Sequence, residues 1–281
     1  MKRKITDKLI DWKKRDTKMP FLLLGARQVG KTYILKEFCE QHYLNPIYIN
    51  LEENNAVRQI FDEKINPEEV IRLISIEMGH RIVPENSIIF FDEIQVSERA
   101  VTSLKYCAES SNKYNIVCAG SLLGVALNRF KGAFPVGKVE INHLYPMDFE
   151  EFLWAANRNE LNEEIKKHFR GIKQMPEIIH NRSMNIYKDY LFVGGMPAAV
   201  LEYLEKGRDI AWFNRDIKNN ILQAYIYDMS KYTTNAENIR IHRLYDSIPK
   251  QLNKENSKFT YKLISEGANK RLYETSIEWL L

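Results

Sequence analysis

The residues whose types and spacing best fit a known chemistry lie at positions 25–32. There the chain reads Gly-Ala-Arg-Gln-Val-Gly-Lys-Thr, which fits the phosphate-loop pattern G-x-x-x-x-G-K-[ST] without deviation. Glycines let backbone N–H groups turn inward around phosphates where a Cβ would clash, and a helix that follows adds its positive dipole end. We therefore predict a nucleotide site in which Lys31 contacts the β- and γ-phosphates and Thr32 offers its hydroxyl to Mg²⁺.

The predicted nucleotide contacts extend through this loop and into the first turn after it. Besides the lysine and the threonine, they are Gly25, Arg27, Gln28, Val29, Gly30 and Tyr33. The apolar run FLLL before the loop predicts a buried strand, and YILKEFCEQ after it predicts a helix. The arginine side chain can point to the phosphates or to solvent, and the sequence leaves both open.

A second candidate group is the pair of adjacent carboxylates that ends the run SIIFFDE at residues 87–93. The carboxylate of Asp92 can hold Mg²⁺ through a water molecule. We therefore assign Asp92 to the metal site together with Thr32. If the strand stays extended, Glu93 points to the opposite side and can polarise a water that attacks the γ-phosphate. The alternative is that the two carboxylates have no role in a site, since a strand that leaves the core would also end in polar residues. No guanine-reading N-K-x-D sequence is present, so the pair favours ATP over GTP.

Two more residues complete the predicted catalytic set. The apolar strand at 115–119 leads into Ser121, and sheets of this kind bind ligands beyond the carboxyl ends of their strands. The serine hydroxyl can contact the γ-phosphate or the lytic water, or it can cap a helix over residues 122–128, and one residue can serve both. Phosphoryl transfer also needs an arginine that offsets the negative charge developing on the phosphate. Arg129 is the first candidate and Arg215 the second, with a solvated surface position as the alternative for both.

Apolar runs alternate with helical patterns over the first half of the chain, which predicts an α/β fold with a parallel sheet covered by helices. A helix is expected to begin at Asn66-Pro67, and Asp148 with Glu151 has the spacing of a capping box. The expected strands are 20–25, 47–51, 87–91, 115–119 and 138–143. We predict an ATPase core over residues 1–146, a helical lid over 147–234, and a partial winged-helix or helix-turn-helix unit over 235–281.

Two patterns in the second half support that division. Apolar residues from Ile210 to Met229 recur every three or four positions and predict one amphipathic helix. Residues 258–265 and 270–281, on either side of Gly267, have the spacing of a helix-turn-helix.

Charge and composition limit the class of protein. The net charge is +4, and residues 1–18 alone carry +5. Such a segment can attract nucleic acid, or it can be the solvated face of a helix whose Ile5, Leu9 and Trp12 pack on the body. No apolar run reaches the ~20 residues of a membrane span.

The three cysteines lie far apart, which favours reduced thiols in the cytoplasm, and no secretory signal is expected. The six histidines have no ligand spacing, so no metal other than Mg²⁺ is predicted.

Together these residues resemble the AAA-like P-loop ATPases of prokaryotes related to the archaeal-ATPase and STAND clade. The resemblance rests on GARQVGKT at 25–32, IIFFDEIQ at 88–95, AGSLLG at 119–124, the stretch at 134–153, and Gly194-Gly195-Met196-Pro197. It implies a sheet of the ASCE type, with Lys31 and Thr32 as Walker A, Asp92 and Glu93 as Walker B, and Ser121 as sensor 1. Gly195-x-Pro197 resembles the G-x-P of the family's lid.

The resemblance implies an ATP- and Mg²⁺-dependent ATPase that acts as a switch, with DNA as a candidate partner and a homo-oligomer as one possible assembly. Two alternatives stay open: a regulator that binds nucleotide and DNA without turnover, and a small-molecule kinase, which Glu93 disfavours. Family members usually continue into another C-terminal domain, so we expect the chain to be a fragment.

Overall fold

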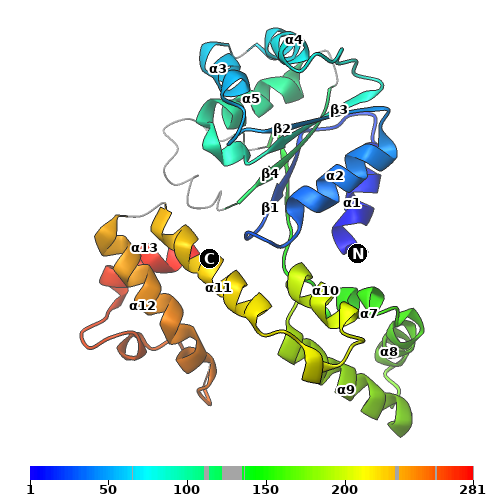
Figure 1. The fold of residues 1–281 in the computed structure, drawn as a ribbon, viewed down its shortest axis with the longest axis vertical. Coiled ribbons are helices and arrows are strands. Elements are labelled where there is room, and N and C mark those ends of the chain that lie inside the picture. The colour runs from blue at the N-terminus through cyan, green and yellow to red at the C-terminus, as the bar shows by residue number, and fades with distance from the viewer. Residues whose placement is uncertain are drawn as a thin grey trace. The chain divides into compact units, whose positions relative to one another are not determined.

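The computed structural model describes residues 1–64, 66–110, 114–121, 135, 137–231, 234–256 and 258–280. The contacts of the described residues divide the chain into two compact units, one that contains residues 1–121 and 137–214 and one that contains residues 215–280. Figure 1 shows the elements of both. No helix among the described residues is both long and apolar enough to cross a membrane.

The first unit is built on a parallel sheet of five strands in the order β2-β3-β4-β1-β5. All five strands predicted from the apolar runs are present. β4 lies between the strand before the phosphate loop and the strand that ends in Asp92, which confirms the α/β P-loop fold class. The strands are β1 (Phe21–Leu24), β2 (Asn45–Asn50), β3 (Ser87–Asp92), β4 (Asn115–Gly120) and β5 (Glu140–His143).

One face of the sheet is covered by α1 (Lys4–Lys13) and α2 (Lys31–His42) (Figure 1). Ile5, Leu9 and Trp12 of α1 are buried in one apolar cluster with α2 and with inward-facing residues of β1, β3 and β4. The indole N–H of Trp12 donates to the carbonyl of Met19 at 2.8 Å, so its polar atom is satisfied. The N-terminal segment is therefore an amphipathic helix packed on the body.

The basic residues of this segment are partly neutralised. The ammonium of Lys4 contacts Asp148 and Glu150 at 2.6 and 2.8 Å, and Arg15 pairs with Glu140. These contacts reduce the positive charge that the segment offers to nucleic acid.

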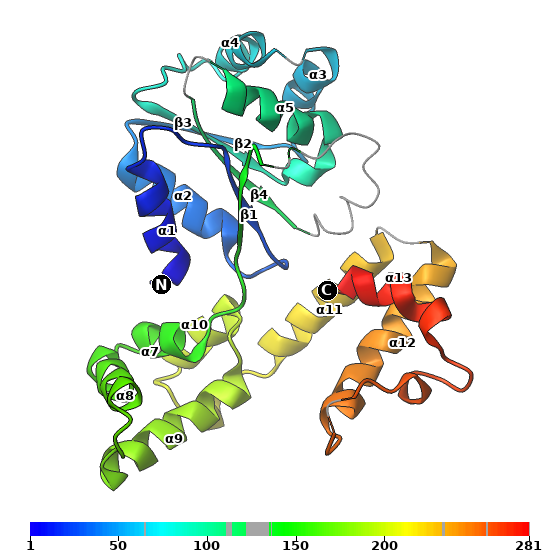
Figure 2. The ribbon, with the colours of Figure 1, turned by 180° about the vertical axis from the view of Figure 1, so that it is seen from behind.

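The opposite face is covered by α3 (Asn55–Glu63), α4 (Pro67–Glu77) and α5 (Glu98–Glu109), which Figure 2 shows from behind. The predicted start of α4 is confirmed: Asn66 caps the helix by accepting from the N–H groups of Glu68 and Glu69. Apolar residues of all three helices pack on the sheet, as in the edge-to-face contact of Phe61 with Phe91.

Helices follow the sheet in the same unit: α7 (Phe149–Ala155), α8 (Asn159–Gly171), α9 (Glu177–Val193), α10 (Pro197–Glu205) and the 3₁₀ turn η2 (Ile210–Trp212). The capping box of Asp148 and Glu151 forms as predicted. The single amphipathic helix expected over 210–229 is wrong. Phe213 has extended backbone and its ring packs on Phe192 of α9, so a new helix begins only at Asp216.

The second unit contains α11 (Asp216–Lys231), α12 (Asn235–Leu252), the 3₁₀ turn η3 (Tyr261–Leu263) and α13 (Lys270–Leu280). A helix over 258–265 was expected and is wrong. The side-chain amide of Gln251 exchanges two hydrogen bonds with the backbone of Thr260, which holds that residue extended. Among the described residues of this unit there is no strand, so the winged helix stays a prediction.

Candidate functional site

The phosphate loop leaves β1 at Gly25 and enters α2 at Lys31. Any side chain on Gly25 would collide with the carbonyl oxygen of Leu144, since a Cβ there would lie 2.2 Å from it. Gly30 has a φ of +96°, a conformation that glycine adopts most readily. Both glycines of the predicted pattern are therefore required by the backbone that surrounds them.

Lys31 is buried at the start of α2, with only 7% of its surface exposed. Its ammonium group donates to the carbonyl oxygens of Gly25 and Ala26 at 2.9 and 2.8 Å. The side chain thus turns back over the loop and places its charge among the loop's polar groups. Gln28 and Tyr33 are exposed beside it, and Val29 is buried beneath it.

Asp92 is buried at the carboxyl end of β3, where three donors meet its carboxylate. The hydroxyl of Thr32 donates to Oδ2 at 2.8 Å, that of Tyr48 donates to the same oxygen at 3.1 Å, and the N–H of Glu93 donates to Oδ1 at 3.0 Å. Burial and the nearby carboxylate raise the pKa of Tyr48 well above its usual value, which keeps this donor protonated. The two residues predicted to hold Mg²⁺ are therefore in direct contact.

Glu93 differs from its predicted conformation. Its φ of +50° and ψ of +43° are left-handed, so the extended strand ends at Asp92 and the alternation argument is wrong for this residue. Its carboxylate nevertheless reaches Ser121 at the end of β4, whose hydroxyl donates to it at 3.3 Å. The amide of Gln95 donates to both residues. Glu93 and Ser121, which were assigned separately to the catalytic set, are thus in contact, and Gln95 bridges them.

A cavity of about 490 Å³ borders the loop. Its walls combine loop residues with side chains from the N-terminus, from α2, from the segment between β5 and α7, and from α10. They are Met1, Arg3, Gln28, Gly30, Tyr33, Ile34, Met147, Pro197, Ala198 and Leu201.

Sequence reasoning missed three residues of this region. Tyr48 lies on a neighbouring strand and Gln95 lies just past the carboxylates, in a stretch quoted for the family but given no role. Arg3 was treated as part of a basic tail. Only the resemblance of Gly195-x-Pro197 to a family motif pointed to the wall of the cavity that Pro197 forms.

The other arginines considered for the site lie in three different places. Arg27 is partly buried within the loop. Arg129 lies outside the described residues. Arg215 directly precedes α11 in the second unit.

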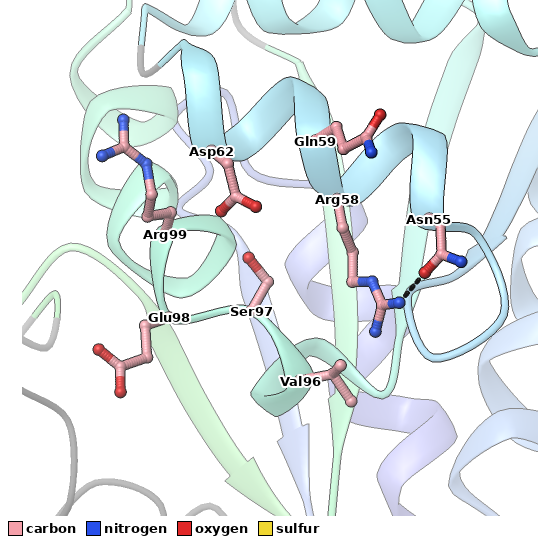
Figure 3. Close-up of a pocket in the computed structure, with 8 residues that line it drawn as sticks. All are labelled: Asn55, Arg58, Gln59, Asp62, Val96, Ser97, Glu98 and Arg99. Carbon is pink, nitrogen blue, oxygen red and sulfur yellow. Dashed lines mark hydrogen bonds between the residues drawn. The ribbon is translucent and has the colours of Figure 1, made fainter.

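A second hollow of about 500 Å³ lies between α3 and the start of α5, away from the loop (Figure 3). Arg58 there bonds to Asn55, and the guanidinium of Arg99 donates to the carbonyl of Phe61. Asp62 and Glu98 balance these charges, so the hollow favours neither anions nor cations.

Comparison with known proteins identifies two regions. Residues 17–153 match a family model described as an AAA domain, and residues 184–281 match one described as a domain of unknown function (DUF8612). A comparison with curated proteins finds no match.

Among solved structures, the Pif1 helicases that unwind forked double-stranded DNA share 14% identity over 58% of this chain and 48% of theirs, with a TM-score of 0.34. This chain thus spans about half of their length. The ORC2 protein of Aeropyrum pernix in its ADP form shares 11% over 97% and 78%, with a TM-score of 0.41. Drosophila ORC bound to DNA shares 12% over 98% and 84%, with a TM-score of 0.40. The AAA match, together with the strand order and the complete phosphate loop, identifies residues 17–153 as an AAA-like P-loop ATPase domain.

Proposed function

We propose that the chain binds ATP with Mg²⁺, hydrolyses it, and uses the cycle as a switch. The observation that carries the proposal is the 2.8 Å contact between the Thr32 hydroxyl and the Asp92 carboxylate, with Thr32 directly following the buried Lys31. Hydroxyl and carboxylate oxygens are the ligands that Mg²⁺ prefers, so this donor set fits the metal. Bound Mg²⁺ would offset charge on the β- and γ-phosphate oxygens.

The cavity beside the loop supports the proposal that the bound nucleotide has a flat apolar base. Its volume is in the range of small-molecule sites, and Ile34, Met147, Pro197 and Leu201 offer apolar contacts. Gly30 belongs both to this wall and to the phosphate loop. We place the adenine in the cavity and the phosphates over the loop.

The roles of the catalytic side chains follow from their contacts. Glu93 accepts a proton from the attacking water, and Ser121 and Gln95 hold its carboxylate in place. Arg129 remains our first candidate for the arginine that offsets charge in phosphoryl transfer.

A single-turnover assay with γ-labelled ATP tests the reaction. Free labelled phosphate is expected. Label on a small molecule would instead identify a kinase, and tight ATP binding without any release would favour the non-hydrolysing regulator.

Asp92→Asn should remove most of the benefit that Mg²⁺ brings to ATP binding. Loss of a carboxylate that holds a metal through water typically lowers the metal affinity by about 10- to 100-fold. We expect ATP affinity to fall by about that factor with Mg²⁺ and to stay unchanged in EDTA, measured by calorimetry. The matched control is Asp62→Asn on the exposed face of α3, which should bind as the parent does. Equal loss with and without Mg²⁺ would contradict the metal role.

DNA is a candidate partner through the second unit. Lys270 and Arg271 are exposed in the first turn of α13, although Lys270 also contacts Glu274 at 3.5 Å. Residues 236–281 carry a net charge of only +2, which supports weak and salt-sensitive binding.

Lys270→Glu with Arg271→Glu should abolish duplex binding in a fluorescence anisotropy titration at two salt concentrations. Arg170→Glu with Lys173→Glu changes the net charge equally at the end of α8 and should weaken binding only slightly. Equal loss in both double variants, or no binding by the parent at low salt, would argue against a DNA contact at α13.

A further inference from the structure

Arg3 is a buried arginine whose guanidinium contacts three separate segments. Its Nη1 donates to the carbonyl of Val29 in the phosphate loop at 2.9 Å. Its Nη2 donates to the carbonyl of Tyr145 at 2.6 Å, and its Nε donates to the carboxylate of Glu151 at 3.0 Å. The residue is only 3% exposed, so these contacts occur away from bulk water, where charged hydrogen bonds are strong.

The contact with Val29 fixes one peptide of the phosphate loop. The peptide bonds are trans, and a trans peptide is planar, with its C=O and N–H on opposite edges. An oxygen held by Arg3 therefore sets the direction of the Gly30 N–H on the other edge. The N–H groups of such loops are what cradle phosphates.

The other two contacts lie where the sheet passes into the helical lid. Tyr145 belongs to the linker of residues 144–147, between β5 and α7, and Glu151 belongs to the capping box of α7. The backbone N–H of Lys4 donates to the second oxygen of Glu151 at 2.7 Å. The linker is also bound to the lid, since Met147 donates to the carbonyl of Gly195 at 2.6 Å.

We propose that Arg3 is a positioning residue of the nucleotide site, which orients the Val29–Gly30 peptide for phosphate binding and connects it to the start of the lid. This inference rests on the proposed function. Because coupling between two sites is reciprocal, a phosphate that pulls on Gly30 should alter the lid contact, and the lid contact should alter phosphate affinity. Arg3 contacts protein oxygens on three sides, so its role is to hold the loop.

Arg3→Lys tests the geometry while it keeps the charge. One ammonium group cannot reach three oxygens that lie in different directions, whereas the planar guanidinium does. We expect ATP affinity to fall by about five- to tenfold, as for one lost hydrogen bond, measured at a temperature at which both proteins are folded, because buried oxygens left without a donor also lower the thermal unfolding midpoint. Lys4→Met is the matched control: it removes the neighbouring ion pairs with Asp148 and Glu150 but leaves the loop contact, and it should bind ATP as the parent does.

Hydrogen exchange separates positioning from a merely structural role. In the parent, saturating ATP should change amide exchange in residues 145–153. In Arg3→Lys that change should be lost even when ATP is raised to saturation. The ligand-free variant should also exchange faster at residues 28–31. Should Arg3→Lys fold poorly, Arg3→Met with Glu151→Gln removes both charges of the buried pair and retains the capping box, and the same loss of coupling is expected.

The outcomes distinguish the two proposals. A parent chain that binds no ATP would overturn the proposed function. A parent that binds ATP, with Arg3→Lys equal to it in affinity and in lid exchange, would overturn only the role of Arg3.

Discussion

Lys31→Ala is expected to bind ATP much more weakly and to lose nearly all turnover. The ammonium group is buried over the loop, within 2.9 Å of the Gly25 and Ala26 carbonyls, where solvent screens its charge poorly. Loss of a charged hydrogen bond to phosphate typically costs about 1.5–3 kcal/mol, roughly 10- to 150-fold in affinity. Calorimetric titration with ATP and Mg²⁺ measures the change directly.

The fold should tolerate this substitution. A positive charge at a helix N-terminus opposes the helix dipole, so its removal costs α2 little. Lys36→Ala is the matched control, since Lys36 lies further along α2 with its ammonium 3.5 Å from the centre of the Tyr48 ring. It should bind ATP as the parent does. Parent-like binding by Lys31→Ala would remove the phosphate loop from the proposed site.

Glu93→Gln is expected to separate binding from hydrolysis. The amide keeps the size of the carboxylate and can still accept the hydrogen bond from Ser121, but it cannot take a proton. ATP affinity should remain within about twofold, and turnover should fall by about 10²- to 10⁴-fold, the range for a lost general base. Phosphate release in the single-turnover assay measures the rate.

Glu98→Gln makes the same chemical change at an exposed carboxylate at the start of α5 and should leave the rate unchanged. If Glu93→Gln hydrolysed ATP at the parent rate, the base would have to be another group. A loss of ATP affinity that matched the loss of rate would instead show that Glu93 holds the ligand.

The centre of the sheet could be predicted because β1, β3 and β4 are apolar runs bounded by polar residues. The carboxyl ends of parallel strands share one edge, so Asp92 and Ser121 could be assigned to one site before their contacts were known. The left-handed backbone of Glu93 could not be predicted, because nothing in the run SIIFFDE marks where the extended conformation ends. Its contact with Ser121 depends on that left-handed turn and was not predicted from the sequence.

The errors in the second half have one cause. Helical spacing of apolar residues predicts a helix, but it does not show which neighbour those residues pack on. Phe213 packs on α9 and interrupts the expected helix over 210–229, and the side chain of Gln251 holds Thr260 extended. Arg3 was missed for a related reason: its partner Glu151 is 148 positions away, beyond the reach of any local pattern.

The strand order has a consequence for how the protein folds during synthesis. β1 pairs only with β4 and β5 among the described strands, so its neighbours in the sheet are residues 115–120 and 140–143. The strand that carries the phosphate loop therefore has no partner in the sheet until β4, which begins 91 positions after Leu24 (115 − 24), has left the ribosome. Contacts so distant along the chain form slowly, and the apolar run FLLL stays unpaired until then. The phosphate loop should consequently be fixed between its neighbouring strands only after β4 and β5 have formed, and the emerging chain should acquire nucleotide affinity only once β5 has left the ribosome.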